Sequence, residues 1–272
     1  MLDTPHPPSG IKRLEETQLF GIRLSAGTLQ TAVSQVLALA RQGRGGLVCA
    51  ANVDMLTRAR RRPALAALLR DADLVLTDGM PLVWALRGLA GLQAIERVSG
   101  PSLTQALLAQ AQAQGLPVYF YGGGTQELAR LVQNLQLRFP GLLIAGAESP
   151  PLLPEEPPED AAALARIRDS GARLVFVGLG CPKQEFWMRR HAPHLDAVCL
   201  GVGYAFPLLA GTQTRAPAWM QRSGLEWLYR LAQEPGRLWR RYLVGNSQFL
   251  GLCLAALPGR VLRRLLALLR GA

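Results

Sequence analysis

The sequence predicts an α/β fold of the Rossmann-like type, a mostly parallel sheet flanked by helices, followed by a basic helical C-terminal appendage. Apolar strand-like runs alternate with helix-like segments over residues 1–211. These runs are continuous in Val, Leu, Ile and Phe, as in strands buried on both faces. Residues 212–272 are helical in period and contain no predicted strand, and they hold 10 Arg, no Lys and two acidic residues, a net +8 of the total +11. We therefore expect two domains, 1–211 and 212–272.

The elements of the first domain follow in chain order from local signals. Apolar runs predict strands at 46–51, 74–77, 117–123, 142–147, 173–180 and 196–203. Helical spacing of apolar residues predicts helices at 63–72, 80–89, 101–115, 125–139, 160–171 and 183–192. Pro63 and Pro101 mark helix starts and Gly115 a helix end, because these residue types are favoured there. Strand–helix alternation implies parallel strands joined by right-handed crossovers.

The ends of the chain and its cysteines bear on localisation. Residues 1–10 are polar and rich in proline, which predicts a loose opening without the features of a signal peptide. No apolar run reaches the roughly 18 residues that cross a bilayer. Four scattered cysteines without a CxxC pair predict buried thiols in a reducing compartment and no zinc site. We expect a cytoplasmic protein, peripheral on the inner face of the cell membrane.

The appendage is expected to face anions. Arginine makes up 28 of the 30 basic residues, and its planar guanidinium group is suited to binding phosphate. The alternative explanation for this excess of arginine is codon usage in a GC-rich genome. Trp, Tyr and Leu among the arginines favour an anionic membrane surface over nucleic acid, for which no binding motif occurs. Near the C-terminus, four leucines share one side of a predicted helix: Leu262, Leu265, Leu266 and Leu269. They predict a helix in a membrane interface or, equally, a dimer contact.

Polar and small residues follow the predicted strands, and ligands of open parallel sheets bind at that edge. Asp78 comes directly after the strand at 74–77, as a candidate general base or substrate anchor. The alternative is that Asp78 caps the next helix. The other candidates at this edge, suited to binding a phosphate-bearing ligand, are Asn52, Gly122, Gly123, Gly178, Gln184, Glu185 and Tyr204.

Three familiar patterns are absent or misplaced. Asp71 and Asp73 match a metal-binding DxD, but they fall at the opposite edge of the sheet, where a solvated turn is expected. Gly122 and Gly124 form a GxG whose third glycine is replaced by Glu127, which disfavours a dinucleotide-binding oxidoreductase. The stretch GLGCPKQE lacks the GK[ST] of a P-loop.

Six strings resemble the WecG/TagA/CpsF family of bacterial glycosyltransferases (glycosyltransferase family 26) over about residues 18–250: ANVDML, LTDGMPLVWALRGLAG, ERVSGPSL, VFVGLGCPKQEFWM, GVGYAF and RAPAWMQRSGLEWLYRLAQEPGRLWRRYL. The resemblance implies inverting transfer of a sugar, typically N-acetylmannosamine, from a UDP-sugar to a polyprenyl-diphosphate-linked N-acetylglucosamine, without a metal or other cofactor. It further implies that Asp78 takes the acceptor hydroxyl proton, that Asn52 orients the sugar or acceptor, and that Arg97 and Gln184 line the donor site.

The appendage gains a role from this resemblance. Arg230, Arg237 and Arg241 are seven and four residues apart, so a continuous helix would place them on one side, although Pro235 is expected to open a new helix. Together with Arg215 and Arg240 they would offset the charge of the acceptor diphosphate or of departing UDP. The appendage also carries the aromatic residues Trp227, Tyr229, Trp239 and Tyr242. These side chains would lie at the level of the lipid headgroups or pack on the core.

Two positions depart from the family pattern. Ala50 stands where threonine is usual, and Pro207 stands where many members carry aspartate. Because polar contacts to hydroxyls set sugar preference, these changes leave glucose or glucuronate as alternative donors. They also leave open a noncatalytic anchor that binds a nucleotide and recruits a polysaccharide complex.

Overall fold

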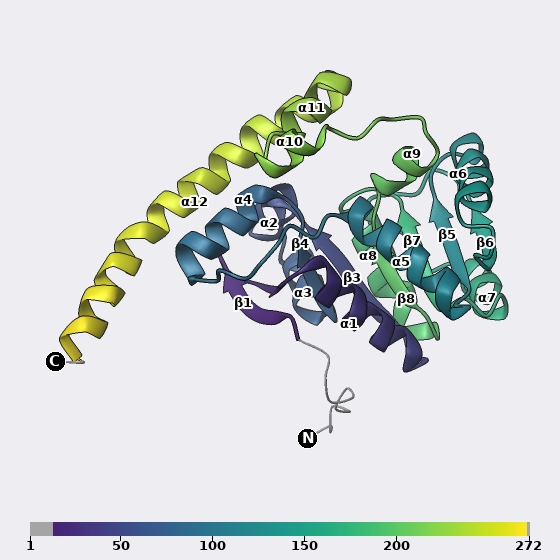
Figure 1. Cartoon of the computed structure of the whole chain (residues 1–272), viewed down its shortest axis with the longest axis horizontal. Coiled ribbons are helices and arrows are strands. Elements are labelled where there is room, and N and C mark those ends of the chain that lie inside the picture. Colours follow the sequence, from purple (N-terminus) through teal and green to yellow (C-terminus); the bar gives the residue numbers. More distant parts are fainter. Residues whose placement is uncertain (1–12, 271–272) are drawn as a thin grey trace.

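A sheet of eight strands runs through the centre of the protein (Figure 1). The computed structural model describes residues 13–270, with side chains described up to residue 257. Neighbouring strands follow the order β1-β2-β4-β3-β8-β7-β5-β6, and every pair is parallel except the β1–β2 hairpin. The strands are β1 Glu15–Leu19, β2 Ile22–Ala26, β3 Gly46–Ala51, β4 Leu74–Thr77, β5 Val118–Gly122, β6 Ile144–Glu148, β7 Leu174–Gly178 and β8 Val198–Gly201.

Helices join these strands and cover both faces of the sheet. They are α1 Leu29–Arg41, α2 Val53–Ala59, α3 Pro63–Asp71, α4 Met80–Ala85 with the π-turn η1 Leu86–Ala90, α5 Gly100–Gln114, α6 Thr125–Arg138, α7 Ala161–Asp169, α8 Lys183–His191 with the 3-10 turn η2 Ala192–His194, and α9 Ala205–Leu209. The Rossmann-like α/β class is thereby confirmed. The hairpin and helices α1 and α2 were not among the predicted elements.

Alternate residues of each central strand enter two separate cores. On one face, side chains such as Val48 and Phe120 pack against α1, α5, α6 and α9. On the other, side chains such as Cys49 and Tyr121 pack against α2, α3, α4, α7 and α8. Strands buried on both faces explain the continuous apolar runs in the sequence.

Three further helices, α10 Ala218–Arg222, α11 Glu226–Gln233 and α12 Pro235–Arg270, follow the sheet. Figure 1 shows α11 beyond one edge of the sheet and α12 running past α2 and away from the body. Phe249 of α12 packs edge-on against Phe20 of the β1–β2 turn, with ring centroids 5.6 Å apart. The predicted leucines from Leu262 to Leu269 lie beyond the described side chains.

Within the described residues, none of the helices combines the length and the apolarity that a bilayer crossing requires.

Candidate active site

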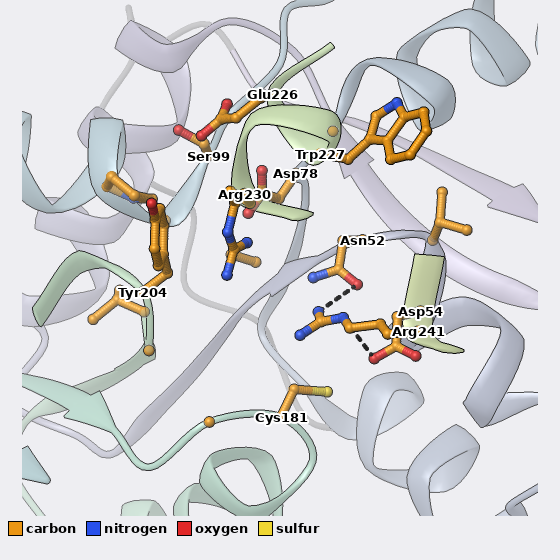
Figure 2. Close-up of a pocket in the computed structure, with 18 of the residues that line it drawn as sticks. Asn52, Asp54, Asp78, Ser99, Cys181, Tyr204, Glu226, Trp227, Arg230 and Arg241 are labelled. Atoms are coloured by element: carbon orange, nitrogen blue, oxygen red, sulfur yellow. Dashed lines mark hydrogen bonds and ion pairs between the residues drawn. The ribbon is translucent and has the colours of Figure 1, made fainter. Parts of the chain in front are cut away.

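A pocket of about 380 Å³ opens at the carboxyl ends of β3, β4, β7 and β8. Asn52 and Asp78 follow two of these strands, and both line the pocket. Helices α11 and α12 complete its wall with Arg230 and Arg241 (Figure 2). The pocket therefore combines residues at the edge of the sheet with residues of the C-terminal helices.

Asp78 is held at the strand end by its backbone. Its N–H donates to the carbonyl of Ala51 at 2.7 Å, which ties the end of β4 to the end of β3. The N-cap of α4 is Gly79, with a φ of 117° that favours glycine, and not Asp78. Asp78 therefore does not cap α4, and its carboxylate lines the pocket.

Charged residues surround the Asp78 carboxylate. Burial is the main influence and raises its pKa, and the nearby Glu226 raises it further. Arg97, Arg230 and the Gly100 backbone amide act in the opposite direction. Figure 2 shows Asp78 beside Arg230 and below Glu226. A carboxylate with a raised pKa binds a proton more readily, which suits general-base chemistry.

Arg97 and Arg215 bridge the two parts of the chain. Arg97, in the loop before α5, forms an ion pair with Glu226 of α11. Arg215 donates to Ser99 at 3.2 Å and to Ser102 at 2.7 Å, both at the start of α5. These contacts fix the C-terminal helices over the edge of the sheet.

A second charged group connects α2 to α12. The Asn52 side-chain oxygen caps α2 by accepting from the Met55 amide at 3.1 Å, and it also accepts from Arg241 at 3.4 Å. Arg241 pairs with Asp54 at 3.1 Å, and Asp54 pairs with Arg58 at 2.9 Å. Because its oxygen is used in this way, Asn52 presents its amide nitrogen to the pocket (Figure 2).

The C-terminal helices bring further cations and aromatic rings to the pocket. The Arg230 guanidinium lies 3.7 Å from the centroid of the Tyr204 ring, a cation–π contact. Trp227 and Tyr242 line the pocket with their ring centroids 5.8 Å apart. Arg237 also lines it and pairs with Glu234.

Gln184 lines the pocket, but its polar atoms serve the protein itself. Its amide nitrogen donates to Glu185 at 2.8 Å, and its oxygen accepts from the Gly180 amide at 3.2 Å. Glu185 is fully buried beneath the pocket, and this burial raises its pKa. The pair shapes the turn after β7, so these atoms of Gln184 are already engaged.

Several predicted site residues lie near the pocket without lining it. Gly122 has a φ of 119°, and a Cβ there would come within 2.7 Å of the Gly178 backbone, so it allows β5 and β7 to approach closely. Gly178 does line the pocket. Arg240 is exposed, with its guanidinium 5.2 Å from the centroid of the Trp239 ring. The predicted residues outside the lining are Gly122, Gly123, Glu185, Arg215 and Arg240.

The lining residues that were not predicted from the sequence include Asp54, Ser99 and Glu226. Glu226 carried a usable signal, because it is one of two acidic residues in an otherwise basic appendage. No group of three or more His, Cys, Asp or Glu side chains suited to a metal ion occurs in the part of the chain that the structure describes.

A mostly parallel sheet with an arginine-lined pocket at its carboxyl edge defines a Rossmann-like protein suited to a phosphorylated ligand. The chain also matches the sequence model of the Glycosyl transferase WecG/TagA/CpsF family over residues 17–262, and it belongs to this family. Membership implies glycosyltransferase activity in cell-surface polysaccharide synthesis, with a nucleotide-sugar donor and a sugar acceptor.

Proposed function

We propose that the protein moves a sugar, N-acetylmannosamine first among the candidates, from a UDP-sugar to a polyprenyl-diphosphate-linked N-acetylglucosamine with inversion and without a metal. The observation that carries this proposal is the Asp78 carboxylate in a pocket whose other charged lining residues include Arg97, Arg230, Arg237 and Arg241. One base and several cations are what a single displacement at a sugar diphosphate requires.

The proposed step is a direct displacement. The acceptor hydroxyl oxygen attacks the anomeric carbon while its proton passes to the Asp78 carboxylate. The bond from the anomeric carbon to the diphosphate oxygen breaks, and UDP leaves with the electron pair. The arginines offset the charge that develops on this leaving group. No covalent sugar–enzyme intermediate forms, so one carboxylate is sufficient.

Replacement of Asp78 by asparagine tests the base assignment. Asn keeps the size of the side chain but cannot accept the hydroxyl proton, so turnover should fall about 10²-fold or more. UDP affinity should stay close to that of the wild type, because the arginines remain. Turnover would be measured with UDP-sugar and a polyprenyl-diphosphate acceptor. Turnover like that of the wild type in this variant would remove Asp78 as the base.

The choice of donor sugar depends on the polar groups that line the pocket. Both positions that depart from the family pattern, Ala50 and Pro207, line the pocket. The hydroxyl and carboxylate that usually stand there are therefore missing from the lining, which favours testing glucose and glucuronate donors as well. Mass spectrometry of products from a panel of UDP-sugars identifies the donor. The absence of product from every donor would favour the noncatalytic anchor.

The proposal includes binding of the C-terminal helices to an anionic membrane surface. Of the twelve large apolar side chains that are exposed among the described residues, eight lie on α10–α12. Five of them fall on one side of α12 by helical spacing, and we call this set the outer stripe: Trp239, Leu243, Leu250, Leu254 and Leu257. An apolar stripe beside arginines is typical of helices that lie in a membrane interface. A lipid-linked acceptor would then be presented close to the pocket.

A further inference from the structure

The ion pair between Arg97 and Glu226 joins the two parts of the chain inside the pocket. The partners are 129 positions apart in the sequence, and their side chains are only 11% and 15% exposed. Removing two charges from water is costly, so a shielded pair is weak evidence for stability. Its location beside Asp78 indicates a role in the chemistry of the site.

We infer that Glu226 is a positioning residue, which holds the Arg97 guanidinium beside the Asp78 carboxylate and balances the positive charge around that carboxylate. This inference rests on the proposed function, in which Asp78 is the base. Glu226 itself is not expected to exchange a proton with the substrate.

The balance of charge around Asp78 supports this role. Arg97, Arg215 and Arg230 all interact electrostatically with Asp78, whereas Glu226 is the acidic residue among its main neighbours. Tyr242 of α12 and the Gly100 amide of α5 face it as well. Without Glu226, three arginine charges would act on one carboxylate. That carboxylate would hold its negative charge more strongly and become a poorer proton acceptor.

The position of Glu226 couples the site to the C-terminal helices. It is the first residue of α11, so it reaches Arg97 only when α11 is docked over the edge of the sheet. The same helix supplies Arg230, which faces Tyr204 and Asp78. Docking of α11 therefore adds a cation and its counter-charge to the pocket together.

Direct titration of Asp78 tests this inference without relying on activity. The eight aspartates of the chain would be labelled with ¹³C at the carboxyl carbon, and Asp78 would be assigned by its loss in D78N. We expect E226Q to lower the Asp78 pKa and R97Q to raise it, each by about one pH unit, because each removes a charge of opposite sign. The double variant should titrate close to the wild type.

Opposite shifts distinguish a charge balance from loss of structure. If the substitutions only opened the pocket to water, both single variants would move the Asp78 pKa in the same direction, towards its ordinary value. That result, or an unchanged pKa in E226Q, would overturn the inference. E148Q is the matched control, since Glu148 pairs with Arg166 at 2.7 Å on β6 and α7, away from the pocket.

Activity gives a separate readout. In E226Q the acidic limb of kcat/KM against pH should move to lower pH together with the Asp78 titration, and E226D should restore part of the wild-type profile. If the wild type forms no product with any donor while the titrations shift as expected, the glycosyl-transfer proposal fails and only the charge balance among Glu226, Arg97 and Asp78 is retained.

Discussion

The Asp78 carboxylate has a consequence for stability as well as for chemistry. Its pKa is raised in the folded protein, mainly by burial. Between the ordinary aspartate pKa and this raised value, the folded chain binds more protons than the unfolded chain. The free energy of unfolding therefore falls as pH rises through that window, and it stays lower above it. The ionised Asp78 lowers the stability of the protein at neutral pH.

The D78N variant should accordingly be more stable than the wild type at pH 7. The expected gain is about 1.4 kcal/mol for each unit by which the Asp78 pKa is raised, and it should shrink to near zero below about pH 3. Urea unfolding at both pH values measures it. A variant no more stable than the wild type at pH 7 would mean that the buried charge is fully compensated by its arginine neighbours.

At the scale of single residues, the sequence could place a site residue only where a predicted strand comes directly before it. Asp78 and Asn52 follow predicted strands, so their place at the carboxyl edge could be inferred before the structure was known. Glu226 could not be placed in this way, because it reaches the pocket beside Arg97, a residue 129 positions away in the sequence. The internal hydrogen bonds of Gln184 likewise depend on how the turn after β7 folds.

At the scale of elements, the burial of a strand largely decides whether it can be predicted from the sequence. All six predicted strands of the parallel sheet are present. Five of them are buried on both faces, which leaves continuous apolar runs. The sixth, β6, lies at an edge of the sheet and is only partly buried. Strand β1, with the sequence EETQL, lies at the edge of the sheet and is largely exposed, so it leaves no such run. Helix α1 has a regular apolar pattern and a Thr28 cap, so the sequence held enough information to identify it.

We expect the docking of α12 to depend on Phe249. Its side chain is 5% exposed and packs on Phe20, on a part of α12 beyond the pocket-lining residues. Phe249→Ala should cost about 3–5 kcal/mol of packing, as large-to-small core substitutions do. We expect hydrogen exchange of the α12 amides to rise while the central strands stay protected. Turnover should fall as Arg241 loses its fixed position.

The neighbouring residue provides the control for this experiment. Leu250 is 59% exposed on the outer stripe, so Leu250→Ala should leave hydrogen exchange in α12 close to that of the wild type in the absence of membranes. Equal exchange in F249A and the wild type would mean that α12 is held by its pocket residues alone.

At the scale of the whole molecule, α12 has two sides that differ in burial. One side carries Tyr242 and Asn246 into the pocket and Phe249 into the core. Another side carries the outer stripe, which is exposed. A helix with both roles would place the pocket at a fixed distance from a membrane surface. The proposed appendage, residues 212–272, would then be both a wall of the active site and its attachment to the lipid that bears the acceptor.

Membrane binding through the outer stripe can be tested on the full chain. The double variant L250E/L254E places two carboxylates where apolar side chains would enter the interface, and both positions are more than half exposed, so folding should be preserved. Each buried leucine contributes about 1.5–3 kcal/mol, so the apparent Kd for anionic liposomes should rise at least about tenfold. Leu152→Glu, at a residue 97% exposed outside the C-terminal helices, should sediment like the wild type.

Added salt should weaken binding of the wild type to anionic liposomes, because arginines contribute to this binding. If L250E/L254E sediments undiminished, the outer stripe does not face the membrane, and the acceptor must reach the pocket by another route.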